Sequence, residues 1–534
     1  MNRVLRRAAV LSTAAALLFA SPAVAAKGFS HGVAAGEVTS KSAILWAHAN
    51  RHGEYELEVA RDEQFESIVE SEEVEAEKSH SNTVQAKVDD LSPDTRYWYR
   101  FRGNGRESDF GQFVTAPPRD ADATIRFAWS GDTDFIPGVG QTEPFWNDGG
   151  VLRSILAEDN DFNIHLGDTI YSDSEVPGRT HPVALTVEQK WAKYRINLGN
   201  AALRALRAST GFYSHWDDHE FINDFSPLED VFTVGSGAES AQVETDGQLL
   251  YRRGVKAFRD YAPVSYSARN GLYRTRRWGR NLELFFLDER SFRSAKADEG
   301  DTCTNPISGE ADLAPTGPVA SRDLFSAIVP SLAAPVAQDC LATINDPNRT
   351  FLGRRQLRRF LRAVKRSTAR FKLIVNEMPI QQYYALPYDR WEGYEAERQL
   401  VLRQLQDVKN VVFITTDVHA TLVNDARFQT LEPGGPINSG ITEIIVGPVA
   451  TANYGLEIDR EIGSPGTGRL LDNVFFESEP PIGVDMTCSI LDQFSYGQVE
   501  VTSNRLTITP KGIDGQPQLD ANDPCGPFVF DFES

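Results

Sequence analysis

HLGDTIY, residues 165–171, closes a short apolar run, FNIHL (162–166), with a glycine, an acid and, three positions later, a tyrosine. The run is short enough for a strand, and Gly167 lets the backbone approach another group closely. A carboxylate and a phenol at the mouth of a strand indicate either a turn or a place that holds a metal ion. The remaining sequence decides which interpretation of Asp168 and Tyr171 applies.

Four further apolar runs have the same character as FNIHL. Stretches with helical spacing separate the runs, at residues 150–159, 188–198, 353–367 and 394–406. This alternation predicts a layered α/β sandwich domain, which we place at residues 124–520. In such domains chemistry gathers where strands end and loops begin. The four runs are IRFAWSG (125–131), LELFFLD (282–288), FKLIVNE (371–377) and NVVFITTD (410–417).

Residues 27–116 have a different pattern, in which apolar and polar residues alternate with period two. LSPDTRYWYRF (91–101) has the form of a sandwich corner, where a tyrosine beside a turn ties the turn to a strand. We therefore predict a small all-β sandwich of fibronectin-like type, joined to the α/β domain by the Pro-rich residues 115–123. The predicted strands are SAILWAHA (42–49), YELEVAR (55–61), TVQAKVDDL (83–91) and RYWYRFRG (96–103).

Residues 1–26 have the pattern of a cleaved export signal, with three arginines, an apolar run and then AVA (23–25). The mature protein would begin near Ala26 or Lys27. Adjacent Arg6 and Arg7 suit a twin-arginine signal, while a general secretory signal is the alternative. A membrane anchor needs a longer apolar stretch, and no later segment is long and apolar enough to span a bilayer. These features predict a secreted or periplasmic protein.

Four cysteines agree with export, because an even number suits an oxidising compartment. Four cysteines allow three pairings. We favour Cys303 with Cys340 and Cys488 with Cys525, since each pair would brace a Pro-rich, poorly periodic segment. Four unpaired thiols are the alternative. A structural zinc site is not expected, because none of the cysteines forms a closely spaced pair.

Charge and length narrow the function classes. The 534 residues carry a formal net charge of -21, which argues against nucleic acid as the main partner. The chain is too long for one hydrophobic core, so we expect two domains. The basic stretch 354–366 has Leu, Phe and Val at helical spacing, which predicts a packed helix with solvated arginines and not a membrane or nucleic-acid surface.

The candidate chemical residues are mostly hard oxygen ligands at the ends of the predicted strands. Such a set suits Ca²⁺, Mg²⁺, Mn²⁺ or a ferric ion better than a thiolate-type zinc site. Two cations that share a carboxylate could clamp a phosphoryl group, and Asp168 is the natural bridge. In chain order the candidates are Asp132, Asp168, Tyr171, Asp217, Asp218, His219, Asn376, Asp417 and His419.

The order of these motifs resembles the calcineurin-like metallophosphoesterases and, more narrowly, the PhoD-type secreted alkaline phosphatases. An Asp is followed by GDxxY, an Asp-His-Glu in the slot of GNHE, a strand-end Asn, and DVH in the slot of GHxH. The resemblance spans nearly the whole mature chain. It is carried by residues 29–48 and by HLGDTIY, WDDHEFIND (216–224), LDERSFR (287–293), residues 352–379 and TTDVH (415–419).

The resemblance implies a role for each residue. One metal, by analogy a ferric ion with Tyr171 as its phenolate ligand, would be surrounded by Asp132, Asp168, Tyr171 and His419. The second, by analogy calcium, would be surrounded by Asp168, Asp218, Asn376 and Asp417. His219 would be catalytic, stabilising developing charge or protonating the leaving oxygen. An acid in a position such as Asp217 is more often exposed to solvent at the start of a helix than bound to a metal ion. Arg290 and Arg293 are candidate phosphate contacts, with surface or strand-end arginine as the alternative.

One position departs from the family pattern. PhoD-type members often have a cysteine in the first motif, where this chain has Asp132. A carboxylate is a harder ligand than a thiolate, so another ion, such as Mn²⁺ or Mg²⁺, or calcium in both places, also fits.

The expected function is that of an exported metal-dependent phosphohydrolase resembling alkaline phosphatase D, which cleaves phosphomonoesters, with phosphodiesters as a second class, by attack of a metal-activated hydroxide. Its expected partners are phosphate-ester small molecules or lipids. The alternatives are a phosphodiesterase or phospholipase D-like enzyme on the same fold, and a non-catalytic calcium-binding surface module. The loops that choose the substrate would be residues 226–247 and 303–340, which lack clear periodicity.

Overall fold

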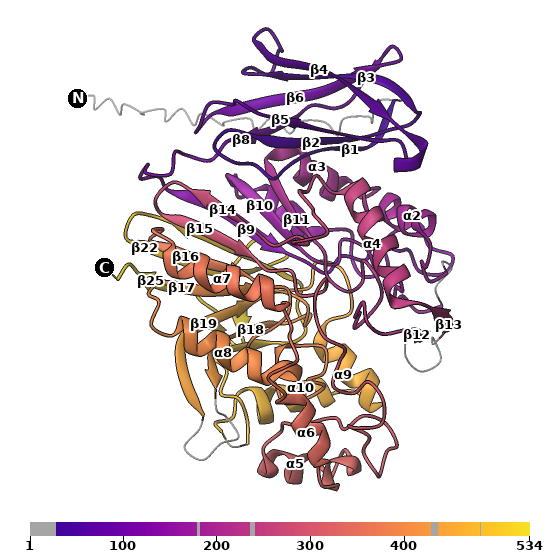
Figure 1. The fold of residues 1–534 in the computed structure, drawn as a ribbon, viewed down its shortest axis with the longest axis vertical. Coiled ribbons are helices and arrows are strands. Elements are labelled where there is room, and N and C mark those ends of the chain that lie inside the picture. Colours follow the sequence, from indigo (N-terminus) through magenta and orange to yellow (C-terminus); the bar gives the residue numbers. More distant parts are fainter. Residues whose placement is uncertain (1–27, 179–181, 235–240, 429–435, 481, 534) are drawn as a thin grey trace, which may run out of the picture.

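The computed structural model describes residues 28–178, 182–234, 241–428, 436–480 and 482–533 (Figure 1). The predicted export signal, residues 1–26, lies outside the described residues. In the part of the chain that is described, no helix is long and apolar enough to cross a membrane.

Two large β-sheets form the centre of the molecule, and both contribute side chains to one apolar core. The first sheet has the order β25 (Phe528–Asp531), β22 (Arg505–Gly512), β21 (Ser495–Val501), β9 (Ile125–Ser130), β10 (Phe162–Leu166), β11 (Gly211–His215), β1 (Phe29–Gly36), β2 (Ala43–Ala49) and β5 (Thr83–Val88). The second has the order β14 (Arg274–Trp278), β15 (Leu282–Phe286), β16 (Phe371–Val375), β17 (Val411–Thr415), β19 (Ile437–Ile445), β18 (Thr421–Phe428) and β20 (Cys488–Ile490).

Alternate residues of each central strand face different cores, as the period of a strand requires. In β9, Phe127 and Trp129 face the core between the sheets, while Ala128 packs with the helices on the outer face. In β15, Leu284 lies between the sheets and Phe285 packs against the other helical layer. Both faces of these strands are buried, and this explains why their sequences are almost continuously apolar.

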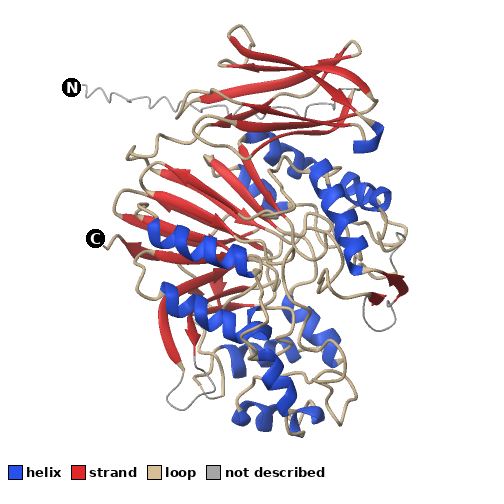
Figure 2. Ribbon diagram, viewed as in Figure 1, coloured by secondary structure: helices blue, strands red, loops and turns tan. Residues whose placement is uncertain are grey.

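Helices cover both outer faces of the sheet pair, as Figure 2 shows. The helix predicted at 353–367 buries Leu357, Phe360 and Val364, so its packed face is confirmed. On the nine-stranded sheet lie α1 (Gly150–Leu156), α2 (Val187–Asn197), α3 (Ala201–Ser209) and α4 (Gly247–Tyr261). On the seven-stranded sheet lie α7 (Arg354–Arg366) and α8 (Glu395–Leu405). The short strands β12 (Val231–Val234), β13 (Ala241–Thr245), β23 (Leu519–Asp520) and β24 (Asp523–Pro524) form two separate pairs.

The N-terminal strands form a β-sandwich at one end of the molecule (Figure 1). The predicted corner is present, since the backbone N–H of Ser92 donates to Tyr97 Oη at 2.9 Å. One layer, β1, β2 and β5, continues the nine-stranded sheet, because Ala35 of β1 pairs with Gly211 of β11. The other layer has β4 (Ile68–Ala76), β3 (Gly53–Ala60), β6 (Arg96–Gly103) and β7 (Arg106–Glu107), with β8 (Gly111–Val114) paired to β6; η1 (Lys78–His80) precedes β5.

A helical lobe lies at the opposite end of the molecule from the sandwich (Figure 1). It contains the helices α5 (Val319–Phe325), α6 (Gln338–Ile344), α9 (Tyr454–Ile462) and α10 (Thr467–Leu471), with the short turns η3 (Pro330–Ala333) and η5 (Asp472–Phe476); η4 (Trp391–Tyr394) leads into α8. Both favoured disulfides are present. Cys303–Cys340 anchors the lobe, and Cys488–Cys525 ties β20 to the C-terminal strands.

Candidate active site

Six strands bring the candidate residues to one edge of the two sheets. β9, β10 and β11 run parallel in one sheet, and β15, β16 and β17 run parallel in the other, so their carboxyl ends meet. The chain turns sharply there. Four candidates have left-handed φ angles, which are uncommon for residues with a Cβ and are typical of functional sites. They are Asp132 (59°), Asp168 (50°), Asp417 (75°) and His419 (54°).

The first predicted ligand set comes together. Asp132, Asp168 and His419 each have a ligand atom within 4.8 Å of the others, and all three side chains are buried. Tyr171 Oη lies 2.9 Å from His419 Nε2. The Asp132 carboxylate is buried, and no side chain among the described residues donates a hydrogen bond to it. A bound cation would stabilise its charged form, so this cluster fits a metal ion.

Glu457, on α9, fixes the other side of the His419 ring, with Oε1 2.6 Å from Nδ1. Burial lowers the pKa of His419, but Glu457 outweighs this effect and raises the pKa to about 9. The contact leaves Nε2 facing Asp132 and Tyr171, as in the carboxylate–histidine pairs that orient metal ligands. Sequence reasoning missed Glu457, because it lies 38 residues beyond His419 with no motif around it.

The second predicted ligand set comes together in part. Asp168, Asp218 and His219 have ligand atoms within 4.8 Å of one another. The same limit holds for the carboxylate oxygens of Asp217, Asp218 and Asp417. Asn376 follows β16 as expected, but its amide is already engaged. Its Oδ1 accepts from Trp391 Nε1 at 3.2 Å, and its Nδ2 donates to the Met378 carbonyl. Asn376 is therefore fully buried beside the cluster, with protein partners on both ends of its amide.

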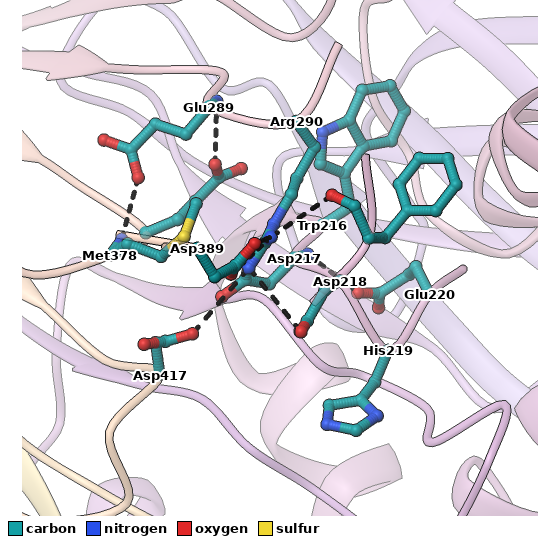
Figure 3. Close-up of polar contacts among 12 residues, drawn as sticks. Trp216, Asp217, Asp218, His219, Glu220, Glu289, Arg290, Met378, Asp389 and Asp417 are labelled. Atoms are coloured by element: carbon teal, nitrogen blue, oxygen red, sulfur yellow. Dashed lines mark hydrogen bonds and ion pairs between the residues drawn. The ribbon is translucent and has the colours of Figure 1, made fainter. Parts of the chain in front are cut away.

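Arg290, which follows β15, lies among three of these acids, Asp217, Asp218 and Asp417, and a fourth, Asp389 (Figure 3). Its Nε donates to Asp217 Oδ1 at 2.6 Å and its Nη1 to Asp389 Oδ2 at 2.7 Å. Its Nη2 lies 3.6 Å from Asp218 Oδ2 and 3.8 Å from Asp417 Oδ1, with no hydrogen-bond partner among the described residues. Neither Arg290 nor Asp217 is a surface residue. The guanidinium is buried and faces the acidic cluster.

Arg293 contacts the acids through Asp389, whose ligand atom lies within 4.8 Å of those of Asp218 and Asp224. It is buried, with Nη1 2.8 Å from Asp389 Oδ1 and Nη2 donating to the Asp389 carbonyl at 2.7 Å. Its Nε donates to Tyr394 Oη at 3.2 Å. These contacts hold the segment that carries Asp389, so the structure shows a supporting position for Arg293 and no contact with the candidate ligands.

His219 is held between Asp173 and Tyr171. Its Nδ1 lies 2.6 Å from Asp173 Oδ1, and its ring stacks on Tyr171 with the centroids 4.0 Å apart. Burial disfavours the charged ring, but the Asp173 carboxylate outweighs this and raises the pKa of His219 well above its usual range. The backbone N–H of His219 donates to Asp168 Oδ1 at 3.1 Å. The His219 ring is therefore fixed beside the Asp168 carboxylate, and Asp173 favours its charged form. Asp173 had no strand-end signal in the sequence.

Glu220 ties the loops of two strands together. Its carboxylate accepts from the backbone N–H groups of Asp168, Thr169 and Asp217 at 2.8–3.0 Å. Lys190 of α2 supports the same loop, because its buried Nζ donates to the Glu220 carbonyl at 2.9 Å. Glu220, the last residue of the Asp-His-Glu motif, thus has a structural role, which the spacing of the motif in the sequence did not reveal.

The clusters carry more negative charge than the protein neutralises. Burial raises the pKa of Asp132 to about 6 and the pKa values of Asp168 and Asp417 well above their usual range, and nearby carboxylates add to the effect on all three. Bound cations would remove this penalty. The ligand atoms are mainly carboxylate oxygens, with a phenol and imidazoles, and such a set fits hard cations.

Comparisons with known proteins agree with this geometry. The family model described as "PhoD-like phosphatase" matches residues 140–508, and "PhoD-like phosphatase, N-terminal domain" matches residues 12–117. Alkaline phosphatase D of Bacillus subtilis (strain 168) is 26% identical over an alignment of 444 residues, which covers 75% of this chain and 66% of that protein. The chain thus spans about two thirds of the length of this relative.

Solved structures show the same fold. "Structure of PhoD" has a TM-score of 0.69 and 21% identity, and it covers 96% of this chain and 90% of its own. The purple acid phosphatase PPD1 from yellow lupin (Lupinus luteus) seeds has a TM-score of 0.52 and 13% identity, covering 91% of this chain and 72% of its own. The predicted metallophosphoesterase-type α/β sandwich with an N-terminal all-β region is confirmed.

Proposed function

Because this chain belongs to the PhoD-like phosphatase family, we propose that it is a metal-dependent phosphohydrolase that cleaves phosphomonoesters, with phosphodiesters as a second substrate class. One observation carries the proposal. Asp168 belongs both to the cluster with Asp132 and His419 and to the cluster with Asp218 and His219. A shared carboxylate between two such clusters suits a pair of cations that clamp one phosphoryl group.

Each of the two clusters would bind one of the two proposed metal ions. Asp132, Asp168, Tyr171 and His419 would hold one ion, by family resemblance Fe³⁺, and Asp168, Asp218 and Asp417 would hold the other, by resemblance Ca²⁺. Asn376 is proposed as a further ligand of the second ion, which requires its Oδ1 to leave Trp391. Bound there, the ions would lower the pKa of an attacking water and offset negative charge on the phosphoryl group.

His219 is proposed as the general acid. Asp173 holds its Nδ1, so the proton on Nε2 is the one available to a substrate oxygen. The stacking contact with Tyr171 and the backbone contact with Asp168 fix the ring beside the place where the phosphoryl group would lie. Transfer of that proton would neutralise the leaving alkoxide. A calcium-binding module without turnover would not need this arrangement.

An assay of the purified mature protein tests the proposal. We expect hydrolysis of an aryl phosphate, and more slowly of a bis-aryl phosphate, at neutral to alkaline pH. Chelation should abolish both rates, and restored Ca²⁺, Mn²⁺ or Fe³⁺ should recover them. His219→Asn should be impaired, and His52→Asn, on the exposed surface of the sandwich, should serve as the matched control. If neither ester is hydrolysed with any of these ions, the proposal fails.

We further propose that residues 1–26 direct export, to the periplasm or the medium, and that residues 27–116 and 124–520 are the two domains. The two disulfides support an oxidising destination. Sequencing the N-terminus of protein recovered outside the cytoplasm should find Ala26 or Lys27 first. Replacing Arg6 and Arg7 with Lys should stop export only if the twin-arginine route is used.

A further inference from the structure

An apolar cavity of about 100 Å³ lies between the helical lobe and the loop that follows β16. Among its lining residues are Phe325, Ile458, Leu471 and Phe475. Arg322, a charged residue of the wall, is paired outside the cavity, with Asp312 at 2.6 Å. Apolar cavities of about this size stay dry and accept a group comparable to benzene.

The cavity shares a helix with the candidate active site. Tyr454 and Ile458 of α9 line it, while Glu457 of the same helix binds His419 Nδ1 at 2.6 Å. The backbone N–H of Tyr454 also donates to the His419 carbonyl at 3.0 Å. The helix that orients a candidate metal ligand therefore also forms a wall of the cavity.

Two unpartnered polar atoms mark the junction between cavity and clusters. The guanidinium of Arg390 lies 5.3 Å from the ring centroid of Tyr383, which lines the cavity, and it hydrogen-bonds to Tyr454. Its Nε and Tyr383 Oη are buried without a hydrogen-bond partner among the described residues. Arg390 also interacts electrostatically with Asp417 of the acidic cluster. Tyr383 lines the cavity and Arg390 lies against its ring, so their unpartnered buried donors point to a ligand oxygen beside this wall.

We propose that the cavity binds an apolar group, ring-sized or a short alkyl chain, on the alcohol of a phosphate ester whose phosphoryl group lies at the acidic clusters. Arg390 then contacts an oxygen between the two parts. This inference rests on the proposed function and narrows its substrate class. A sugar or glycerol group would lose its hydrogen bonds to water in the cavity and find few new partners.

Calorimetry on the metal-loaded mature chain tests the assignment with phenylphosphonate, methylphosphonate and benzyl alcohol. We expect phenylphosphonate to bind about 10- to 100-fold more tightly than methylphosphonate, the range for small apolar groups in a fitted pocket. Leu471→Trp fills the cavity and should remove this preference. Ile328 also lines the cavity but is 43% exposed, so Ile328→Trp should fill the cavity from its rim with less risk to folding. Leu400→Trp, 43% exposed on α8 outside the cavity, is the matched control.

The outcomes separate this inference from the proposed function. Equal affinity for the two phosphonates in the wild type, or a preference that survives both filling variants, overturns the subsite. Benzyl alcohol, which lacks the phosphoryl group, should bind the wild type and Leu400→Trp but neither filling variant, and failure to bind the wild type also overturns the subsite. If benzyl alcohol binds and neither phosphonate does, the proposed function is contradicted and the substrate assignment falls with it.

Discussion

Asp168 is the residue at which the two acidic clusters meet. Its carboxylate also accepts the backbone N–H of His219, so it positions the proposed acid as well as the proposed ions. Asp168→Asn keeps the shape and removes the charge. We expect kcat/KM for an aryl phosphate to fall by about 1,000-fold or more, which is about 4 kcal/mol of transition-state stabilisation. Asp159→Asn, on the exposed surface, is the control, and an unimpaired Asp168→Asn enzyme would contradict the shared-ligand role.

Tyr171 is the residue that tests the identity of the first ion. If its phenolate binds a ferric ion, charge transfer from oxygen to metal should colour concentrated protein. Tyr171→Phe should then remove the visible absorption band and cost about 1 kcal/mol of stability for the lost contact with His419. Absorption spectra and metal analysis of the wild type and Tyr171→Phe measure the visible band and the iron content. A colourless, iron-free and fully active wild type would assign the site to hard divalent cations, which Asp132 in place of a cysteine also suits.

Glu457 supports the proposed metal ligand His419, so its replacement should change the affinity for the first metal ion. Glu457→Gln keeps a hydrogen-bond acceptor beside His419 Nδ1 but removes the charge that stabilises and orients the ring. We expect the affinity of the first metal ion to fall about 10- to 100-fold, with little change at the second. Titration of the metal-free protein with each ion measures this. Glu461→Gln, exposed on the same helix, is the matched control, and equal affinities in the two variants would contradict the role.

The sequence located the acids at strand ends but not their partners. Asp132, Asp168 and Asp417 each follow an apolar run, and that position made them recognisable. Asp173 and Glu457 lie in a loop and on a helix, where acids are common, and only the folded chain shows them against His219 and His419. A residue that acts through another has no pattern of its own to detect.

At the scale of elements, the strands that the periodicity predicted are present within a residue or two, except that the run predicted at 83–91 ends at Val88. β11 was not predicted, because GFYSH (211–215) is short and contains a serine and a histidine. Its place in the sheet comes from pairing with β10 and β1, which no local pattern encodes. The helical lobe was also beyond prediction, since α5, α6 and α10 are only five to seven residues long.

The Cys303–Cys340 disulfide should stabilise the segment 303–340, which forms part of the wall of the apolar cavity. It closes a segment with a sequence separation of 37, for which chain entropy predicts a contribution of about 4 kcal/mol. We expect the Cys303→Ser, Cys340→Ser double variant to be cut within residues 303–340 by a protease that spares the wild type. The Cys488→Ser, Cys525→Ser variant has the same separation and should leave that segment resistant. Equal resistance of wild type and the first variant would contradict the bracing role.

At the scale of the whole molecule, the sandwich is built into the catalytic sheet. The sequence predicted an all-β region but could not show that β1 would pair with a strand about 175 residues away, since such pairing depends on the assembled fold. His48 of β2 lies at the junction where the sandwich meets α4, in contact with His31 of β1 and stacked on Tyr261 of α4. The junction is therefore a place where protonation can affect the assembly of both parts.

His48 should make the stability of the molecule depend on pH. Burial, together with Arg195 of α2, lowers its pKa from 6.5 to about 4. Below pH 6.5 the unfolded chain takes up a proton at this ring while the folded protein does not, so the free energy of unfolding falls as the pH drops towards 4. From pH 7 to pH 5 the loss due to this group is about 2 kcal/mol. Urea unfolding at the two pH values should show a smaller loss for His48→Gln than for the wild type. His52→Gln, on the exposed turn before β3, should lose as much stability as the wild type, and equal losses in all three proteins would show that the junction does not sense protons.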